Sequence, residues 1–219
     1  SYVESMDTAE EIERLSGVFY RWTRGVDIAL LFSAIQGVLQ RYDTLEALFT
    51  AGFESGHQTV REALIHAVEE LRAEALQAAV EAGLPGEELG DLPRGIRHVL
   101  ASPETGSACK RWNMYLRWML RPADGGVDLG IWRGIPLSAL VLPLDTHTHR
   151  LGRFLGLTER RDGSWKTAVE ITQGLAHLDP ADPVRFDFSL AHLGISGGCL
   201  GRREESVCTL CPLDSVCTA

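Results

Sequence analysis

The chain has 219 residues, five cysteines and a formal net charge of −9, and 45% of its residues are hydrophobic. That length suits one large domain or two small ones with a sizeable core, and the composition excludes disordered, collagen-like and disulfide-dense classes. No apolar run reaches the roughly 18 residues of a membrane span and no signal peptide is recognisable, so we expect a cytoplasmic protein without a membrane partner. The first residue is Ser1, so we expect the true N-terminus to lie upstream.

Apolar residues at three- and four-residue spacings predict helices almost throughout the chain. Ser107 and Asp145 are candidate N-caps, and Gly83, Pro85 and Gly86 are expected to end a long helix. No period-2 strand series is present, so the expected fold class is all-α with two helical lobes. The expected helices cover residues 26–41, 58–82, Ser107 to about Leu120, a segment opened by Asp145, 165–177 and 183–194.

The charges are distributed unevenly along the chain. Residues 1–93 carry 6 basic and 17 acidic side chains, residues 94–161 carry 11 and 5, and residues 162–219 carry 4 and 8. Residues 94–161 therefore form a basic island, which indicates contact with a polyanion, unless the arginines are a chance excess on a solvated surface. We expect these three segments to be an acidic helical region, a basic helical lobe, and a cysteine-bearing end that packs with the first region.

Four of the five cysteines lie in the last 21 residues: Cys199, Cys208, Cys211 and Cys217. Thiolates so close in sequence can hold one metal centre, either structural zinc or an iron–sulfur cluster. The alternatives are disulfides, which a reducing cytoplasm disfavours, and unconnected buried thiols, which the clustering disfavours. From the residues alone zinc is favoured, because one C-x2-C pair is present. Cys109 stands apart, and we interpret it as a small buried hydrophobic residue.

Two segments carry a family resemblance. Residues 144–151 read Leu-Asp-Thr-His-Thr-His-Arg-Leu, and the terminal cysteines follow them after intervening helices. Together they resemble the catalytic-aspartate segment and the [4Fe–4S] loop of the helix-hairpin-helix DNA glycosylases, the superfamily of endonuclease III and MutY. The likeness covers roughly residues 105–217. It is greatest to an uncharacterised branch, on residues 106–114 and 127–132, although the usual hairpin turn is not recognisable before Asp145.

The resemblance implies a base-excision repair enzyme that cleaves the N-glycosidic bond of a damaged base. Asp145 would be the essential carboxylate, and Lys110 a Schiff-base nucleophile that adds abasic-site lyase activity. The separation of these two residues resembles that of the archaeal 8-oxoguanine glycosylases, which suggests an oxidised purine as the base. The four terminal cysteines would hold a [4Fe–4S] cluster in place of zinc. The expected partner is double-stranded DNA with a flipped base, bound by a monomer at the nucleoid.

Other readings of these residues remain open. Asp145 could simply cap its helix, and Lys110 could hold a phosphate at a helix N-terminus. A metal triad of Asp145 with the two following histidines is disfavoured, because helical residues two apart face different directions. The further candidate contacts to nucleic acid are His147, His149, Arg150, Arg153, Arg111, Asp128 and Trp132.

Two other functions are alternatives to the glycosylase. The first is a non-catalytic iron–sulfur protein that binds nucleic acid. The second is a glycosidic-bond enzyme that acts on RNA or on nucleosides. An Asp145→Asn variant discriminates between an enzyme and a binding module, because it should abolish turnover in the enzyme and hardly weaken binding in the module.

Overall fold

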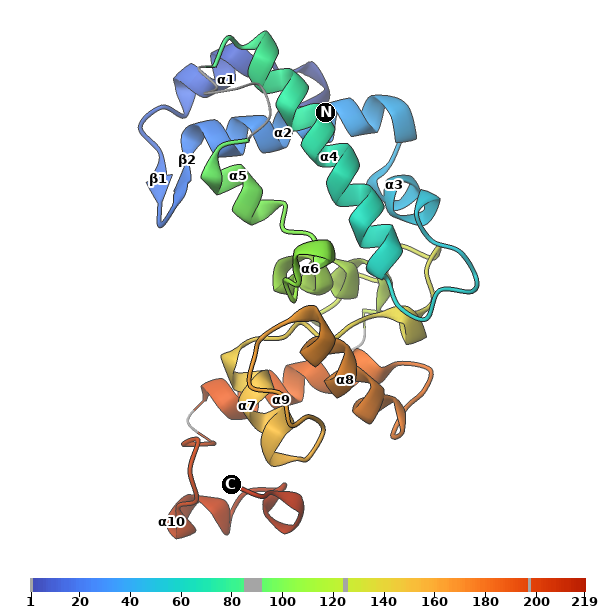
Figure 1. The fold of residues 1–219 in the computed structure, drawn as a ribbon, viewed down its shortest axis with the longest axis vertical. Coiled ribbons are helices and arrows are strands. Elements are labelled where there is room, and N and C mark those ends of the chain that lie inside the picture. The colour runs from blue at the N-terminus through green and yellow to red at the C-terminus, as the bar shows by residue number, and fades with distance from the viewer. Residues whose placement is uncertain (1, 85–91, 124–125, 197) are drawn as a thin grey trace. The chain divides into compact units, whose positions relative to one another are not determined.

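The computed structural model describes residues 2–84, 92–123, 126–196 and 198–219. Helices dominate these residues, and their only strands form one two-stranded antiparallel hairpin, so the expected all-α class is confirmed (Figure 1). Within the same residues, no helix combines the length and apolar character needed to cross a membrane. The chain divides into two compact units. Unit 1 comprises Ser1–Glu54 and Arg61–Ser102, and unit 2 comprises Ser55–Val60 and Pro103–Ala219.

Unit 1 contains two of the helices expected from periodicity. The segments 26–41 and 58–82 correspond to α2 and α4 below. Pro85 and Gly86 lie outside the described residues, and Gly83 adopts a positive φ of 64°, a conformation common just after a helix. The elements of unit 1, with 3₁₀ helices labelled η, are η1 (Val3–Ser5), α1 (Thr8–Arg14), β1 (Phe19–Tyr20), β2 (Thr23–Arg24), α2 (Gly25–Tyr42), α3 (Leu45–Ala51), α4 (Arg61–Glu81) and α5 (Arg94–Val99).

Helices α2 and α4 pack against each other and form the centre of unit 1. Each has an apolar face that repeats at three- and four-residue spacings, so one side of each helix is removed from water. Burial of one leucine side chain contributes roughly 1.5–3 kcal/mol relative to an exposed one. The core residues on these two faces that are at most 1% exposed include Leu30, Ala34, Val38, Leu64 and Leu71.

Asp27 joins the start of α2 to the start of α5. Its carboxylate accepts the Arg24 N–H at 2.7 Å and the Ile96 N–H at 2.8 Å, and the residue is only 3% exposed. The approach requires glycine at position 95, because a Cβ there would lie 2.0 Å from Asp27 Oδ2. A buried carboxylate is therefore satisfied by two backbone donors, as such groups need to be.

Unit 2 contains the remaining expected helices. The segment opened by Asp145 is α7, residues 165–177 give α8, and residues 183–194 divide into η5 and α9. Its elements are η2 (Pro103–Thr105), α6 (Lys110–Leu120), η4 (Leu137–Ala139), α7 (Thr146–Phe154), α8 (Trp165–Ala176), η5 (Pro183–Phe186), α9 (Asp187–Ile195), α10 (Glu205–Cys208) and η6 (Asp214–Val216).

Helix α7 packs closely against both α8 and α9 because glycines stand at the two contacts. A Cβ at Gly152 would lie 2.7 Å from Ile171 Cδ1 of α8. A Cβ at Gly194 of α9 would lie 2.6 Å from the Cβ of His147. Helix α7 is therefore held at a fixed distance from both neighbours, and its first residues are placed with it.

Two details differ from the expectations. The helix expected from Ser107 begins at Lys110, and its N-cap is Cys109. Ser107 lies just before the helix, where its Oγ accepts the Cys109 N–H at 3.2 Å. The units also do not follow the charge segments. Residues 94–102 belong to unit 1, and residues 162–219 belong to unit 2 with most of the basic island.

Candidate functional site

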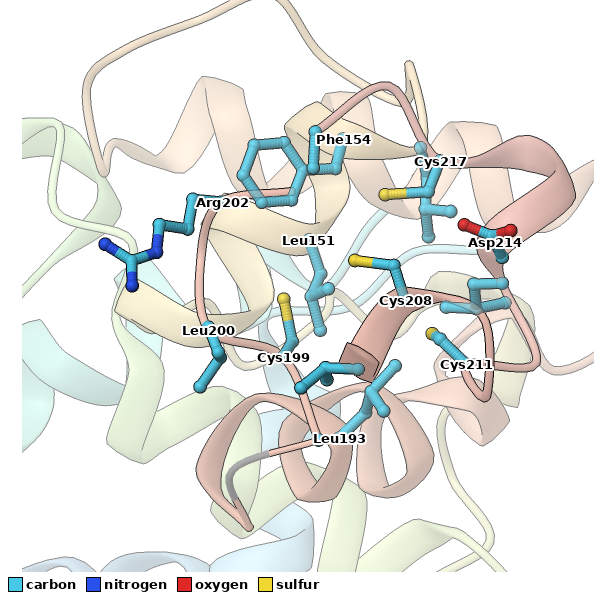
Figure 2. Close-up of a pocket in the computed structure, with 15 residues that line it drawn as sticks. Leu151, Phe154, Leu193, Cys199, Leu200, Arg202, Cys208, Cys211, Asp214 and Cys217 are labelled. Carbon is cyan, nitrogen blue, oxygen red and sulfur yellow. The ribbon is translucent and has the colours of Figure 1, made fainter. Parts of the chain in front are cut away.

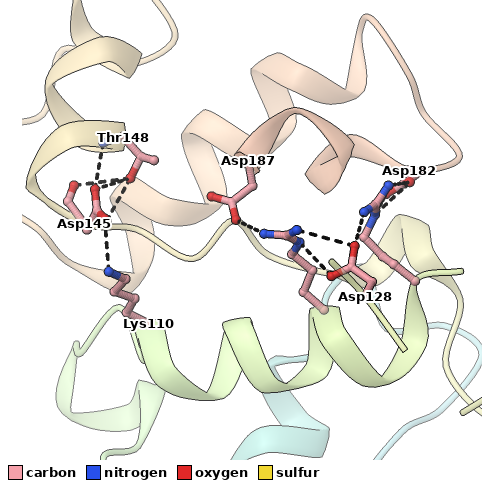
Figure 3. Close-up of polar contacts among 8 residues, drawn as sticks. Lys110, Asp128, Asp145, Thr148, Asp182 and Asp187 are labelled. Atoms are coloured by element: carbon pink, nitrogen blue, oxygen red, sulfur yellow. Dashed lines mark hydrogen bonds and ion pairs between the residues drawn. The ribbon is translucent and has the colours of Figure 1, made fainter. Parts of the chain in front are cut away.

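The structure brings together the two residues expected to be catalytic. Lys110 is the first residue of α6, and Asp145 is the N-cap of α7, 35 residues later. Lys110 Nζ lies 3.0 Å from Asp145 Oδ2, and Figure 3 shows the two side chains directed toward each other. Their side chains are 44% and 17% exposed. The pair is thus close to solvent while the carboxylate is largely enclosed.

Asp145 also caps α7, as the alternative interpretation expected. Its Oδ1 accepts the N–H of His147 at 2.8 Å and that of Thr148 at 2.9 Å, while Thr148 Oγ1 accepts the Asp145 N–H at 2.8 Å. The two carboxylate oxygens therefore have different partners. Oδ1 fixes the side chain to the helix, and Oδ2 faces Lys110. In this geometry Asp145 can cap the helix through Oδ1 and at the same time interact with another group through Oδ2.

The environment of Asp145 favours its charged form. Burial by itself raises the pKa of this carboxyl, but the Thr148 N–H and the ammonium of Lys110 outweigh that effect, and the pKa lies below its ordinary value. Asp145 is therefore ionised at neutral pH. It presents a fixed negative charge beside a cation.

Lys110 leaves a turn with an uncommon backbone conformation. Cys109 immediately before it has φ 48° and ψ 40°, the left-handed region that residues other than glycine seldom adopt. The turn is anchored to the start of α8, because the Trp165 N–H donates to the Gly106 carbonyl at 2.9 Å. Cys109 is 4% exposed, which confirms the expectation that it is buried. The direction of Lys110 is thus set by a tethered turn.

A buried ion-pair network follows Lys110 along α6. Arg117 lies two helical turns after Lys110 and therefore on the same face. Its Nη1 donates to Asp187 Oδ2 at 2.6 Å, and its Nε lies 3.3 Å from Asp128 Oδ1. Arg121 contacts Asp128 as well, and its Nε donates to Asp182 Oδ2 at 3.0 Å (Figure 3).

Asp128 was expected to line a pocket for the flipped base, but it is buried between two arginines. It is 3% exposed, and both of its oxygens face arginines. Trp132, the other candidate pocket residue, is 8% exposed, and its ring meets that of Tyr115 edge-on at 5.4 Å. These two residues belong to the interior of unit 2.

Asp187 was not expected from the sequence. It is the first residue of α9 and is 4% exposed. Burial raises its pKa above the ordinary value despite Arg117, and the negative charge of Asp145 contributes to the rise. Asp187 thus lies within electrostatic reach of Asp145 and Lys110. The sequence signal for such a partner was the spacing of Lys110 and Arg117. These two basic residues are seven apart on one helix and therefore share a face that acidic residues can contact.

The other candidate contacts have mixed environments. His149 Nε2 lies 2.9 Å from the Arg160 carbonyl, and Arg111 and Arg153 are exposed. His147 is half-buried beside α9, and its buried Nδ1 has no hydrogen-bond partner among the described residues. The two arginines thus lie at the surface of the unit that holds the pair, and the two histidines pack against protein groups.

The four terminal cysteines line one pocket. Figure 2 shows the sulfur atoms of Cys199, Cys208, Cys211 and Cys217 facing the same space. All five cysteines of the chain are free thiols. The wall around the four is mainly apolar and includes Leu151, Phe154, Leu155, Leu193, Leu200 and Val207.

The donor set of this pocket fits a thiolate-ligated centre. Four cysteine thiols in one mainly apolar pocket are the ligands that a [4Fe–4S] cluster or a structural zinc ion takes. Across residues 2–84, 92–123, 126–196 and 198–219, no group of three or more His, Cys, Asp and Glu side chains that could hold a metal ion is found. The four cysteines share a pocket but do not form a metal-binding group as they are placed, so the metal centre stays a prediction from their residue type and spacing.

Arg150 and Phe154 connect the cysteine segment to α7. Arg150 Nη2 donates to the Cys199 carbonyl at 3.3 Å, so this arginine, a candidate phosphate contact, is used within the protein. The N–H and hydroxyl of Thr218 both donate to the Phe154 carbonyl, at 2.8 and 3.0 Å. Helix α7 thus carries Asp145 at its start and supports the cysteine pocket along its second half.

Comparison with known proteins places the chain in a family. Residues 1–196 match the family described as "Protein of unknown function (DUF2400)". The chain belongs to this family. The matched range includes Lys110 and Asp145 and ends before Cys199. No curated protein and no solved structure matches the chain.

Proposed function

We propose that the chain is a DNA N-glycosylase of base-excision repair, as its resemblance to the helix-hairpin-helix glycosylases implies. The single observation that carries the proposal is the contact between Lys110 Nζ and Asp145 Oδ2 at 3.0 Å. The motif resemblance assigned roles to these residues without reference to their spatial arrangement. Their contact across 35 residues is what one shared site requires.

Asp145 would stabilise the transition state. Cleavage of the bond between C1′ and the base nitrogen leaves positive charge on the sugar, and the bonding electrons go to the base. A nearby carboxylate lowers the energy of that charge. Asp145 is suited to this role because its pKa is lowered and Oδ1 is locked by the helix cap. Oδ2 is therefore presented in a fixed direction.

Lys110 would form a Schiff base with C1′. The amine must first lose a proton to solvent, while Asp145 Oδ2, at hydrogen-bond distance, would hold Nζ in position and keep its own negative charge. Nζ then forms a bond to C1′ as the bond to the base breaks and its electrons go to the base. Breakage of the C1′–O4′ bond would open the sugar ring and convert this adduct to an imine, and loss of a C2′ proton would then expel the 3′ phosphate by elimination. Abasic-site lyase activity would follow from this step.

The cysteine pocket would hold a [4Fe–4S] cluster through Cys199, Cys208, Cys211 and Cys217, as the resemblance implies. The bound group would supply a structural cross-link among four points of the terminal segment. Arg150 and Phe154 would attach this segment to the second half of α7 through their contacts with it. Brown protein that contains iron and acid-labile sulfide supports the cluster, whereas colourless protein that contains zinc supports the alternative.

The test uses the full chain and duplexes that carry single damaged bases, with 8-oxoguanine first. Base release by the wild type and its loss in Asp145→Asn are expected, with a fall of about 10²–10³ in turnover, as for removal of one electrostatic contact to a transition state. Asparagine is as good an N-cap as aspartate, so this variant keeps the helix cap and removes only the charge. No base release from any damaged DNA, RNA or nucleoside by the wild type would contradict the proposal.

The same ion pair favours one other function. A charged lysine at a helix start, 44% exposed, is suited to bind a phosphate. In a non-catalytic nucleic-acid-binding protein, Lys110 would remain protonated, and Asp145 would hold its side chain in place. Such a protein would bind abasic duplex without cleavage, and Lys110→Gln would weaken binding while Asp145→Asn would hardly alter it.

A further inference from the structure

A cavity of ≈ 640 Å³ lies in unit 1 beside the β1–β2 hairpin. This volume is within the roughly 300–1,000 Å³ typical of ligand pockets. The hairpin forms one wall, and the first residues of α2 and α5 contribute to the other. The residues that line it are Phe19, Arg21, Trp22, Arg24, Val26, Asp27, Leu84, Pro93, Arg94 and Gly95.

The register of the hairpin explains which side chains reach the cavity. Phe19 pairs with Arg24, and Tyr20 pairs with Thr23. Directly opposite residues of an antiparallel pair project from the same face. The face of Phe19 and Arg24 is the one that lines the cavity. An aromatic ring and a guanidinium group are therefore presented side by side.

The aromatic side chains of this hairpin are unusually open to solvent. Phe19 is 67% exposed, Tyr20 68% and Trp22 52%. The Trp22 ring meets the ring of His98 edge-on, with centroids 5.6 Å apart, which orients it while half of its surface stays accessible. Clustered exposed aromatic groups on a folded protein mark a binding surface more often than single exposed ones do.

The charge of the cavity selects an anionic ligand. Arg21, Arg24 and Arg94 are exposed, and no ion pair of these three is found among the described residues. The carboxylate in the lining belongs to Asp27, whose two oxygens already accept backbone N–H groups. Among the described residues that line the cavity, three arginines therefore accompany one carboxylate, although residues 1–93 are the most acidic segment of the chain.

We propose that this cavity binds unpaired nucleotides of a single-stranded nucleic acid. A base would stack on Trp22 or Phe19, and the flanking phosphates would pair with Arg24 and Arg94. Aromatic stacking platforms combined with arginines are the usual means of binding single strands without sequence preference. The cavity belongs to unit 1, and the inference does not rest on the glycosylase chemistry of Lys110 and Asp145 in unit 2.

The test measures binding of the full chain to a labelled oligothymidine of roughly 12 nucleotides, within the known site sizes of single-strand binders. Fluorescence anisotropy should show that Trp22→Ala weakens binding by roughly 5- to 150-fold, the loss expected for one stacked base. Trp22→Phe should retain most of the affinity. Circular dichroism of each variant verifies that the fold is kept. We expect it to be kept, because the Trp22 side chain is half exposed and contributes little to the core.

Arginine variants test the electrostatic part. A double variant, Arg24→Gln with Arg94→Gln, should lower the slope of log K against log salt by roughly 1.4, because two phosphate contacts of a single strand are lost. Arg41→Gln is the matched control in unit 1, since Arg41 already contacts Glu70 and Glu74. It should leave both the affinity and the slope unchanged.

Three results would overturn the inference. The first is unchanged affinity in a folded Trp22→Ala chain. The second is displacement of the oligonucleotide by inorganic polyphosphate at equal phosphate concentration, which would indicate a general anion site. The third is tighter binding to anionic lipid vesicles than to the oligonucleotide. Because the strand contains no damaged base, failure here is distinguishable from failure of the glycosidic cleavage test.

Discussion

The two ends of α7 support two very different sites. At its start, Asp145 caps the helix, contacts Lys110 and, without touching it, raises the pKa of the buried Asp187. Along its second half, α7 faces four free thiols in a mainly apolar pocket. The first site is built from contacts that the chain makes with itself. The second site is a pocket of four cysteine thiols that would be completed by a bound metal or cluster.

This difference has a consequence for stability. A site made of paired charges should keep its geometry whatever the terminal segment binds. A pocket of thiols should be ordered mainly by its ligand, because metal binding and local folding are coupled.

Arg117→Met should have the largest effect on the charged end. It leaves Asp187 buried without its cation and Asp128 with Arg121 alone, and removal of one partner of a buried pair costs about 3–5 kcal/mol. Urea unfolding measures the loss. Arg185→Met, at the exposed pair with Asp179, is the control and should cost less than about 1 kcal/mol. Equal losses in the two variants would show that the buried network is not what stabilises α6 and α9.

Cys211→Ser should affect only the other end. We expect bound iron or zinc to fall to near zero and amide exchange to rise across residues 199–218, because one of four ligands is lost. Amides at the starts of α6 and α7 should keep their protection. Cys109→Ala, outside the pocket, is the control for loss of a thiol and should retain its metal. Loss of protection around Lys110 in Cys211→Ser would mean that the two ends are not independent.

Thr148→Ala should have a smaller effect at the charged end. It removes the hydroxyl that accepts the Asp145 N–H at 2.8 Å, and loss of one such hydrogen bond costs about 1 kcal/mol. Thr146→Ala, one residue into the helix and exposed, is the matched control and should be neutral. If the two alanine variants unfold at the same urea concentration, the reciprocal cap contributes nothing.

The smallest effect concerns acid pH. Because the folded-state pKa of Asp145 is lowered, its ionised form stabilises the fold above the unfolded pKa of about 3.9, and this contribution is lost as pH falls through the folded value. The difference in unfolding free energy between wild type and Asp145→Asn should therefore shrink as pH falls below about 4. A difference that stays constant from pH 7 to pH 2 would contradict the lowered pKa.

The sequence predicts local structure and motif residues better than long-range contacts. Periodicity located α2, α4 and α8 because their apolar faces extend over several turns. Asp145 was identifiable as a cap because capping depends on residues three apart. The hairpin was missed, since two-residue strands are too short to show an alternating pattern.

Contacts between distant segments account for the rest. The Arg117–Asp187 pair joins residues 70 apart, and neither residue belongs to a motif. Arg150 donates to the Cys199 carbonyl, 49 residues away, and its local sequence gave no sign of this partner. Asp27 and Ile96 are likewise paired by tertiary packing alone. Such pairs depend on the tertiary structure and cannot be read from local sequence.

Borohydride trapping on abasic-site duplex tests the central claim most directly. The chain has two lysines, Lys110 and Lys166, so a covalent adduct on lysine has few places to form. We expect wild type and Lys166→Gln to give a trapped protein–DNA adduct, and Lys110→Gln to give none. Peptide mapping should place the adduct on Lys110. An adduct that persists in Lys110→Gln, or its absence from the wild type with duplex bound, would contradict the assignment of Lys110 as the nucleophile.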